Sequence, residues 1–196
     1  MTEWTDAVFT GDDWGGRELA ADSFLRCTFA DVDMLELVST GTVFQSCRFG
    51  NTRFNVSQHS GSAFLNCAFD RCTLFDAEFD DCKLTGSTFT GCDLRPLTVR
   101  GGDLSFVNLR FADLRGVSIT GTRMREADLT EANCAGATLS GVDLSAAHLD
   151  KADFSKTDLR GSDLAGLDAR ILDLAGAIVH AEQAVQLVQT LGLDVR

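Results

Sequence analysis

Large apolar residues recur at every fifth position of the chain, from Trp4 to Val179. Leu, Phe, Trp, Met, Ile or Val fills 32 of these 36 positions, and 11 of the 14 phenylalanines lie there. The residue two places before each large one is usually small, the residue just before it is usually polar, and glycine stands two places after it in 14 repeats. Residues 127–131, ADLTE, show the unit in full. The chain is therefore a tandem array of pentads.

A period of five matches neither an α-helix, with 3.6 residues per turn, nor a flat strand, whose side chains alternate with a period of two. One residue type stays on one side only if the chain turns once per pentad. The small and the large residue then point inward, and the polar and glycine positions form a corner. Successive coils built from such short sides can pair backbone to backbone. The pattern therefore predicts an all-β solenoid with a layered core.

The period alone leaves the number of sides open, because three or four pentads could both close a coil. Columns of residues 20 apart favour four sides, since like residues then stack. One such column is an aromatic ladder, and another is a line of small thiols: Phe9, Phe29, Phe49, Phe69 and Phe89; Cys27, Cys47 and Cys67. The register never slips between Trp4 and Val179, so no loop is expected to interrupt the repeat.

The pattern changes after Val179. Apolar residues there follow helical spacing, and Gly192 ends the series; they are Ala181, Ala184, Val185, Val188 and Leu191. We expect a repeat domain over residues 1–180 and a helix with a short tail over residues 181–196. The helix covers the open end of the core or pairs with a copy of itself, and Val185, Val188 and Leu191 form the apolar stripe for dimerisation.

An unbroken series of A(D/N)LXX units resembles the pentapeptide repeat family, whose members fold as right-handed quadrilateral β-helices. On that resemblance the 36 pentads make about nine coils, or roughly 43 Å of rod at the strand spacing. Residues 57–99, which contain the unusual SQH and the LRPLT around the lone proline, resemble a mycobacterial fluoroquinolone-resistance subgroup of this family. Pro96 sits at a corner, where its missing N–H removes one ladder bond, so we expect a local bend or a cis peptide there.

The resemblance also implies a function. Members of the subgroup are dimers joined through their C-terminal ends, are similar to B-DNA in size and charge, and bind DNA gyrase in place of its DNA segment. This implies a homodimer whose partner is bacterial DNA gyrase, and protection of the enzyme from fluoroquinolone-type poisons. Two alternatives stay open: immunity to another topoisomerase-directed antibiotic, and a scaffold-type repeat protein with no topoisomerase target.

Composition and charge narrow the classes of partner. The 196 residues carry 29 acidic and 17 basic side chains, a formal charge of −12. This charge repels nucleic acid and anionic membranes, so we expect no direct nucleic-acid or membrane partner. The chain has no apolar run long enough for a membrane span, and its start, MTEWTDAVFTGDDW, lacks the features of a signal peptide. We therefore expect a cytoplasmic protein.

The candidate chemistry is sparse. Six of the seven cysteines occupy small inward sites and Cys134 a large one, which makes them core fillers rather than metal ligands or disulfides, and we expect no metal and no cofactor. His59 stacks on Ser39 with a spacing of 20 residues. We interpret the pair as a buried hydrogen bond rather than a catalytic dyad, and expect no enzyme.

Carboxylates are the remaining candidates for a binding surface. When the pentads are counted in fours, the polar site of one face holds six acids among nine positions, interrupted by Arg53, Thr73 and Asn133; these acids are Asp13, Asp33, Asp93, Asp113, Asp153 and Asp173. Stacked like charges are unfavourable, which suggests that the row has a use against gyrase. A duplex of the same length carries a charge of about −25, so the protein imitates about half of it.

Overall fold

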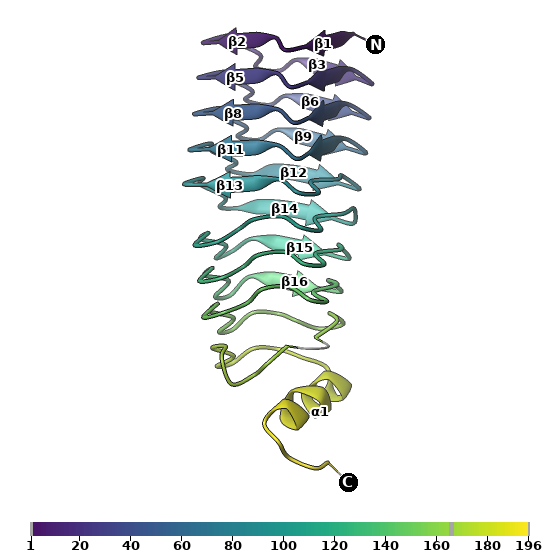
Figure 1. Cartoon of the computed structure of the whole chain (residues 1–196), viewed down its shortest axis with the longest axis vertical. Helices are drawn as coiled ribbons and strands as arrows, with labels where there is room; N and C mark the ends of the chain where they lie inside the picture. The colour runs from purple at the N-terminus through teal and green to yellow at the C-terminus, as the bar shows by residue number, and fades with distance from the viewer. Residues whose placement is uncertain (1, 165–166, 196) are drawn as a thin grey trace.

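The computed structural model describes residues 2–164 and 167–195. The chain winds into a column of stacked coils, with the N-terminus at one end and a short helix closing the other (Figure 1). The corner expected at residues 165 and 166 lies outside the described residues. The predicted parallel β-solenoid with a short C-terminal helix is confirmed.

Each coil contains four pentads. Every backbone pair joins residues 20 apart, from Trp4 with Phe24 near the start to Asp158 with Ile178 near the end. A three-sided coil of 15 residues is thereby excluded. We number the faces by their first large residue: face 1 begins at Trp4, face 2 at Phe9, face 3 at Trp14 and face 4 at Leu19. Coil 1 spans residues 2–21, and each later coil adds 20 residues.

Three faces carry parallel sheets. Face 1 holds β1 (Glu3–Thr5), β4 (Ser23–Leu25), β7 (Val43–Gln45) and β10 (Ala63–Leu65). Face 2 holds β2 (Val8–Thr10), β5 (Thr28–Ala30), β8 (Arg48–Gly50), β11 (Ala68–Asp70) and β13 (Thr88–Thr90). Face 4 holds β3 (Glu18–Ala20), β6 (Val38–Thr40), β9 (Gln58–Ser60), β12 (Ala77–Asp80), β14 (Leu97–Arg100), β15 (Ser118–Thr120) and β16 (Thr138–Ser140). Among the described residues, face 3 is joined by isolated bridges alone.

The expected count of about nine coils is too high for the regular solenoid. The longest sheet stacks seven strands, so the sheet structure amounts to about seven turns. Beyond β16 the same face continues through the single bridges of Thr138 with Asp158 and of Asp158 with Ile178. The count from the sequence was high because it included the C-terminal coils, which keep the 20-residue register through single bridges rather than strands.

The core is a set of stacked columns. Ring centroids in the predicted aromatic ladder lie 4.9 Å apart for Phe9 and Phe29, 4.8 Å for Phe29 and Phe49, 4.9 Å for Phe49 and Phe69, and 4.5 Å for Phe69 and Phe89. This spacing is close to the distance between paired strands, so the backbone ladder places each ring on the next.

The corners require an unusual backbone. The residue two places after a large one usually has a positive φ, and 14 of the glycines with positive φ lie at that site or at the paired Gly101 and Gly102. Where a side chain stands at the corner, it generally adopts the same left-handed conformation, as Val56 does at φ 59°. Glycine recurs in the repeat because it takes this conformation without strain.

Pro96 occupies one of these corner sites and departs from the common backbone. Proline is confined to a negative φ, so it cannot take the left-handed conformation of its counterparts. The peptide bond between Arg95 and Pro96 is cis. The predicted irregularity at this corner is therefore confirmed.

The C-terminal helix α1 (Ala181–Thr190) follows the last pentad directly. The His180 N–H donates to Oε1 of Gln183 at 2.7 Å, which caps the first turn. Leu191 is the C-cap, and Gly192 follows with φ 79°. The helix therefore ends at the glycine that the sequence pattern indicated.

Candidate functional site

The coiling places all six predicted aspartates on face 3. Bridges pair Asp13 with Asp33 and Asp153 with Asp173 directly. We call this set the acidic row: Asp13, Asp33, Asp93, Asp113, Asp153 and Asp173. The row is interrupted by Arg53, Thr73 and Asn133, as predicted for coils of four pentads.

Each carboxylate of the acidic row has a structural role at the corner where the sequence placed it. Its Oδ1 accepts a hydrogen bond from the backbone N–H two residues further on, which fixes the turn after each large residue. The bond measures 2.9 Å for Asp13 to Gly15, 3.0 Å for Asp33 to Leu35, 3.3 Å for Asp93 to Arg95, 3.3 Å for Asp113 to Arg115, 2.8 Å for Asp153 to Ser155 and 3.0 Å for Asp173 to Ala175. The stacking of acids therefore has a reason in folding.

Arginine neutralises part of the row. Asp113 pairs with Arg115 at 2.7 Å and with Arg95 at 3.0 Å. The hydrogen bond from Arg115 holds the pKa of Asp113 below its usual value, so the carboxylate stays ionised and paired. Asp33 pairs with Arg53. Four members of the row form no ion pair within residues 2–164 and 167–195 and carry its uncompensated charge: Asp13, Asp93, Asp153 and Asp173.

The C-terminal coils are acidic on every side, not only on face 3. Residues 126–196 contain 12 acidic and five basic side chains, a net charge of −7. Aspartates stand at the polar site of the other three faces as well: Asp143 and Asp163 on face 1, Asp128 and Asp168 on face 2, and Asp158 on face 4. Hydrogen bonds from Ser145 and Arg160 lower the pKa of Asp143 and of Asp158. The aspartates of face 3 are therefore only one part of this acidic end.

The helix at the same end presents two different sides. The buried Gln183 side chain donates to the carbonyls of Leu159 and Ser162, both at 2.8 Å, and Leu187 packs on the core. The predicted dimerisation residues are less covered: Val185 is 38 % exposed, Val188 is half-buried and Leu191 is 52 % exposed. The helix covers the core and still leaves an apolar surface.

Further apolar side chains are exposed near the same end of the chain. Four further apolar side chains at this end are about half exposed, and they are Ile171, Ile178, Leu193 and Val195. An uncovered apolar patch of this kind marks an interaction surface.

The buried polar cluster is structural. Nδ1 of His59 lies 2.7 Å from Oγ of Ser39, and its Nε2 lies 3.0 Å from Oγ of Ser57, so both ring nitrogens are satisfied. Burial lowers the pKa of His59 to about 3, which keeps the ring neutral. The side chain is 1 % exposed, so solvent and substrates do not reach it. The predicted hydrogen bond to Ser39 is confirmed.

The cysteines fill the core as expected. Six of them are buried and Cys92 is half-buried, all with free thiols. Several of their Sγ–H groups donate to carbonyls of the preceding coil, as Cys47 does to Phe24 at 3.3 Å. Burial raises the pKa of Cys82 to about 11 and that of Cys134 to about 12, so these thiols are not reactive at neutral pH.

Within residues 2–164 and 167–195, no group of three or more His, Cys, Asp or Glu side chains is placed to hold a metal ion. In the same residues, no helix has the length and apolar character to cross a bilayer.

Comparison with known proteins supports the family that the repeat resembles. A family model described as "Pentapeptide repeats" matches residues 60–95, 98–130 and 127–166 in eight copies. The pentapeptide repeat protein MfpA of Mycobacterium tuberculosis is 37% identical over 75 residues, and its counterpart in Mycolicibacterium smegmatis is 32% identical over 74 residues. Each alignment covers 38% of this chain and about a third of the relative, 33% and 31% of its length.

Solved structures share the whole architecture. QnrB1, a plasmid-mediated fluoroquinolone resistance protein, superposes with a TM-score of 0.87 in a trypsin-treated variant form, over 98% of this chain and 99% of that one. Its sequence is 23% identical, so the likeness shows the fold. Full-length QnrB1 superposes with a TM-score of 0.72 over 97% of this chain.

Proposed function

Because this chain belongs to the pentapeptide repeat family, we propose that it is a cytoplasmic DNA mimic that binds bacterial DNA gyrase and protects it from fluoroquinolone-type poisons. The partial identity to MfpA and the shared fold with a fluoroquinolone resistance protein support this choice. The chain acts by occupying a surface, without catalysis.

The observation that carries the proposal is the acidic C-terminal end. Aspartates stand on all four faces there, and two pairs, Asp143 with Asp163 and Asp153 with Asp173, are stacked one coil apart, at about 4.8 Å. A groove that binds the phosphates of a duplex is positive on several sides, because the duplex presents charge all around its axis. A rod that is acidic on one face would match only part of such a groove.

Dimerisation would lengthen this acidic region. If two chains join through the apolar surface of α1, their acidic ends meet in the middle of a rod of twice the length. The dimer contact then lies between two segments that each carry a net charge of −7. The centre of the dimer, rather than its tips, is the part that resembles DNA in charge.

A gyrase supercoiling assay tests the proposal through charge alone. The double substitution Asp153→Asn and Asp173→Asn keeps the side-chain oxygen that caps the turn and removes two uncompensated charges per chain. We expect the double variant to need a severalfold higher concentration for half inhibition, and added salt to weaken the parent protein more than the variant.

The matched control is Asp113→Asn on the same face. Asp113 is already paired with Arg95 and Arg115, so it offers little net negative charge to a basic groove, and we expect inhibition to stay close to that of the parent when it is replaced. Equal inhibition by the parent and the double variant would reject the mimicry. If the protein inhibits gyrase but does not protect it from the drug, gyrase binding stands and the role in resistance is rejected.

The dimer is tested with Val185→Asp and Leu191→Asp together. Both side chains are exposed, so the fold tolerates the change while the apolar surface gains two charges. Light scattering is expected to give the mass of one chain for this variant and of two chains for the parent. A parent protein with the mass of a single chain would refute the dimer.

A further inference from the structure

The N-terminal end of the rod is an open end of three sheets. β1, β2 and β3 are the terminal strands of their sheets, and Figure 1 shows them together in the outermost coil. One coil further on, the N–H of Thr28 donates back to the Ala7 carbonyl at 2.9 Å. The equivalent group in coil 1 is the N–H of Val8, and no described strand lies on that side of β2. Such an edge is a template on which a second chain can add a strand.

The apolar core is also exposed at this end. Trp4 is 41 % exposed, whereas Phe24, its counterpart one coil further on, is 1 % exposed. Phe9 and Leu19 are half-buried, and these four side chains line a hollow of about 380 Å³. The other end of the rod is covered by α1. Among the described elements, no helix or strand covers the N-terminal end in the same way.

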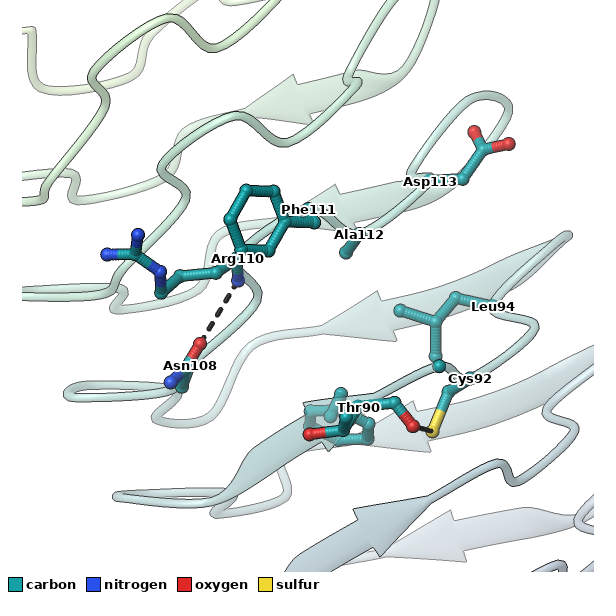
Figure 2. A pocket seen from close by; sticks show the side chains of 10 residues that line it. Thr90, Cys92, Leu94, Asn108, Arg110, Phe111, Ala112 and Asp113 are labelled. Atoms are coloured by element: carbon teal, nitrogen blue, oxygen red, sulfur yellow. Dashed lines mark hydrogen bonds between the residues drawn. The ribbon is translucent and has the colours of Figure 1, made fainter.

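A larger groove on the side of the rod differs from this open end. About 590 Å³ lies between coil 5 (residues 82–101) and coil 6 (residues 102–121) on face 3, where the backbone hydrogen bonds of the neighbouring coils are missing between Leu94 and Asp113 in the described structure. Figure 2 shows Leu94 on one side of the groove and Phe111 and Asp113 on the other. The two coils stay paired by bridges on faces 1 and 2 and by β14 with β15 on face 4. The groove is therefore a local gap within one rod, and the N-terminal end is the place where another coil could stack.

Charged side chains line the N-terminal hollow from positions that are uncharged in the rest of the repeat. Three of the 36 small inward sites hold a charged residue, and they are Asp12, Arg17 and Asp22. All three line the hollow. The later small inward sites, from Cys27 to Ala177, hold only uncharged residues. The repeat therefore changes its inward chemistry at this end alone.

Two of these three residues lack a structural partner. Oδ1 of Asp22 accepts the N–H of Thr2 at 2.6 Å, which fixes the first strand. The carboxylate of Asp12 forms no hydrogen bond or ion pair within residues 2–164 and 167–195. The guanidinium of Arg17 lies 4.9 Å from the centre of the Trp14 ring and forms no ion pair in the same part of the chain. Neither Asp12 nor Arg17 has a partner in folding comparable with that of Asp22.

The next coil shows what stacking would do to Asp12 and Arg17. Val32 and Leu37 occupy the same two sites one coil further on, and both are 0 % exposed. A coil laid on coil 1 would bury a carboxylate and a guanidinium in the same way. Burial of a charge is strongly unfavourable unless the charge is paired. Inward-pointing charges are one of the features by which natural sheets keep an edge free.

From these observations we propose that Asp12 and Arg17 close the N-terminal end of the rod against a second copy of the chain. The copy that is excluded presents its own N-terminal end, because α1 covers the core at the other end. Coil 1 carries five acidic side chains and one basic side chain, so two N-terminal ends also repel each other. Rods then do not join at both ends into fibres. This last consequence rests on the proposed C-terminal dimer, whereas closure of the N-terminal end does not.

Exchange of the two charges for the residues of coil 2 tests the proposal. The double variant Asp12→Val and Arg17→Leu removes one acid and one base, so it leaves the net charge unchanged. It is made in a chain that also carries Val185→Asp and Leu191→Asp, which block the C-terminal surface. Light scattering in about 0.5 M salt, where the acids around the end are screened, is expected to show twice the mass of the C-terminally blocked chain without the double variant.

The matched control exchanges one acid and one base at outward sites. Glu18→Val and Arg48→Thr introduce residues that neighbouring coils carry there, and both side chains are exposed. This control is expected to keep the mass of one chain. A second uncharged end, Asp12→Thr with Arg17→Ser, takes the residues of coil 3 and is expected to pair as the first does. Circular dichroism checks the fold of each variant, and exchange of the Val8 N–H is expected to slow as the paired form accumulates.

Several outcomes would overturn the proposal. They are uncharged variants that stay at the mass of one chain, a control that pairs equally, or pairing of the C-terminally blocked chain that keeps Asp12 and Arg17. A mass that grows beyond two chains would also count against it, because two N-terminal ends form a closed pair and further growth is non-specific. The unblocked parent tests the C-terminal dimer separately. A mass of one chain there would refute that dimer and leave the N-terminal comparison intact.

Discussion

The N-terminal and C-terminal coils use one repeat in two ways. Over residues 2–90, short strands lie on faces 1, 2 and 4, and phenylalanines stack through the core. From residue 108 onward, face 4 keeps β15 and β16, and the other described pentads are joined by single bridges around cores of leucine and alanine. Figure 1 shows the change as arrows giving way to plain coil down the column.

The difference follows the residue just before each large one. In every strand pentad this residue is something other than Asp or Asn, as with Thr28 or Val43. Where it is Asp or Asn, its side chain accepts the N–H two residues on, and a turn replaces the end of the strand; Asp128 and Asn133 show this at 3.0 Å each. The repeat can therefore vary its corner chemistry without losing its period.

This comparison changes the meaning of the acidic residues. Aspartate occurs in the C-terminal coils partly because it closes turns, and the negative charge comes with it. Asparagine would close the same turns without charge. The preference for aspartate over asparagine, rather than the presence of a polar residue, is the feature that function must explain.

The largest expected effect tests the aromatic core. Phe49→Ala removes a ring stacked between Phe29 and Phe69 and is expected to lower the free energy of unfolding by about 3–5 kcal/mol. Leu129→Ala, fully buried in the C-terminal coils, is the matched control, with a smaller expected loss of about 2–3 kcal/mol. Urea unfolding of both variants measures the difference, and a larger loss for Leu129→Ala would contradict the ranking.

A second prediction, with an effect of intermediate size, is that the stability of the N-terminal coils depends more strongly on pH than that of the C-terminal coils. The pKa of His59 falls to about 3 in the folded chain against about 6.5 in the unfolded one, so the unfolded chain binds the extra proton between these values. Stability from this group is full above about pH 6.5 and decreases as the pH falls, by about 2 kcal/mol at about pH 5.

Amide exchange followed by NMR is the measurement, with β9 expected to lose more protection than β16 between about pH 7 and about pH 5. His59→Phe is the control, because Phe79 already stacks on the ring at 4.6 Å, and this variant is expected to lose the extra pH dependence. An unchanged pH dependence in His59→Phe would show that other groups cause it.

The smallest effect concerns the turns of the C-terminal coils. Asp153→Ala removes the acceptor for the Ser155 N–H, a bond of 2.8 Å, and is expected to lower the free energy of unfolding by about 1 kcal/mol. Asp153→Asn retains the acceptor and is expected to change the free energy of unfolding by only about a few tenths of a kcal/mol. Thermal unfolding compares the two variants, and equal stability of both would mean that the turn does not depend on this bond.

Much of the fold could be predicted because the residue types within each pentad determine which positions face inward and which form the corner. A large residue such as Phe49 points inward wherever the chain turns once per pentad, and the corner two residues later favours glycine. The helix after His180 was also evident from its spacing. Asp and Asn at the polar site mark where strands give way to turns. The sequence assigned these residues to corners and to charge, but the loss of strand that accompanies them was not predicted.

The surfaces were harder to predict. Gln183 has the position of an ordinary polar residue of the helix, and its burial against Leu159 and Ser162 depends on where the last coil ends. Pro96 signalled an irregularity in one coil. The backbone hydrogen bonds missing between Leu94 and Asp113, and the exposure of Phe111, depend on how coils 5 and 6 stack.

The sequence by itself determined the period, the inward and outward positions and the register, since these are local properties repeated 36 times. The period left three or four pentads per coil open, the columns of like residues favoured four, and the tertiary structure settled it. The tertiary structure alone decided that the C-terminal acids surround the rod and that a groove opens on face 3. The physical reason is that closure and stacking depend on the sum of many corners and on bonds between residues 20 apart. Small differences at single corners, such as a missing N–H, therefore acquire their effect only when one coil is laid on the next.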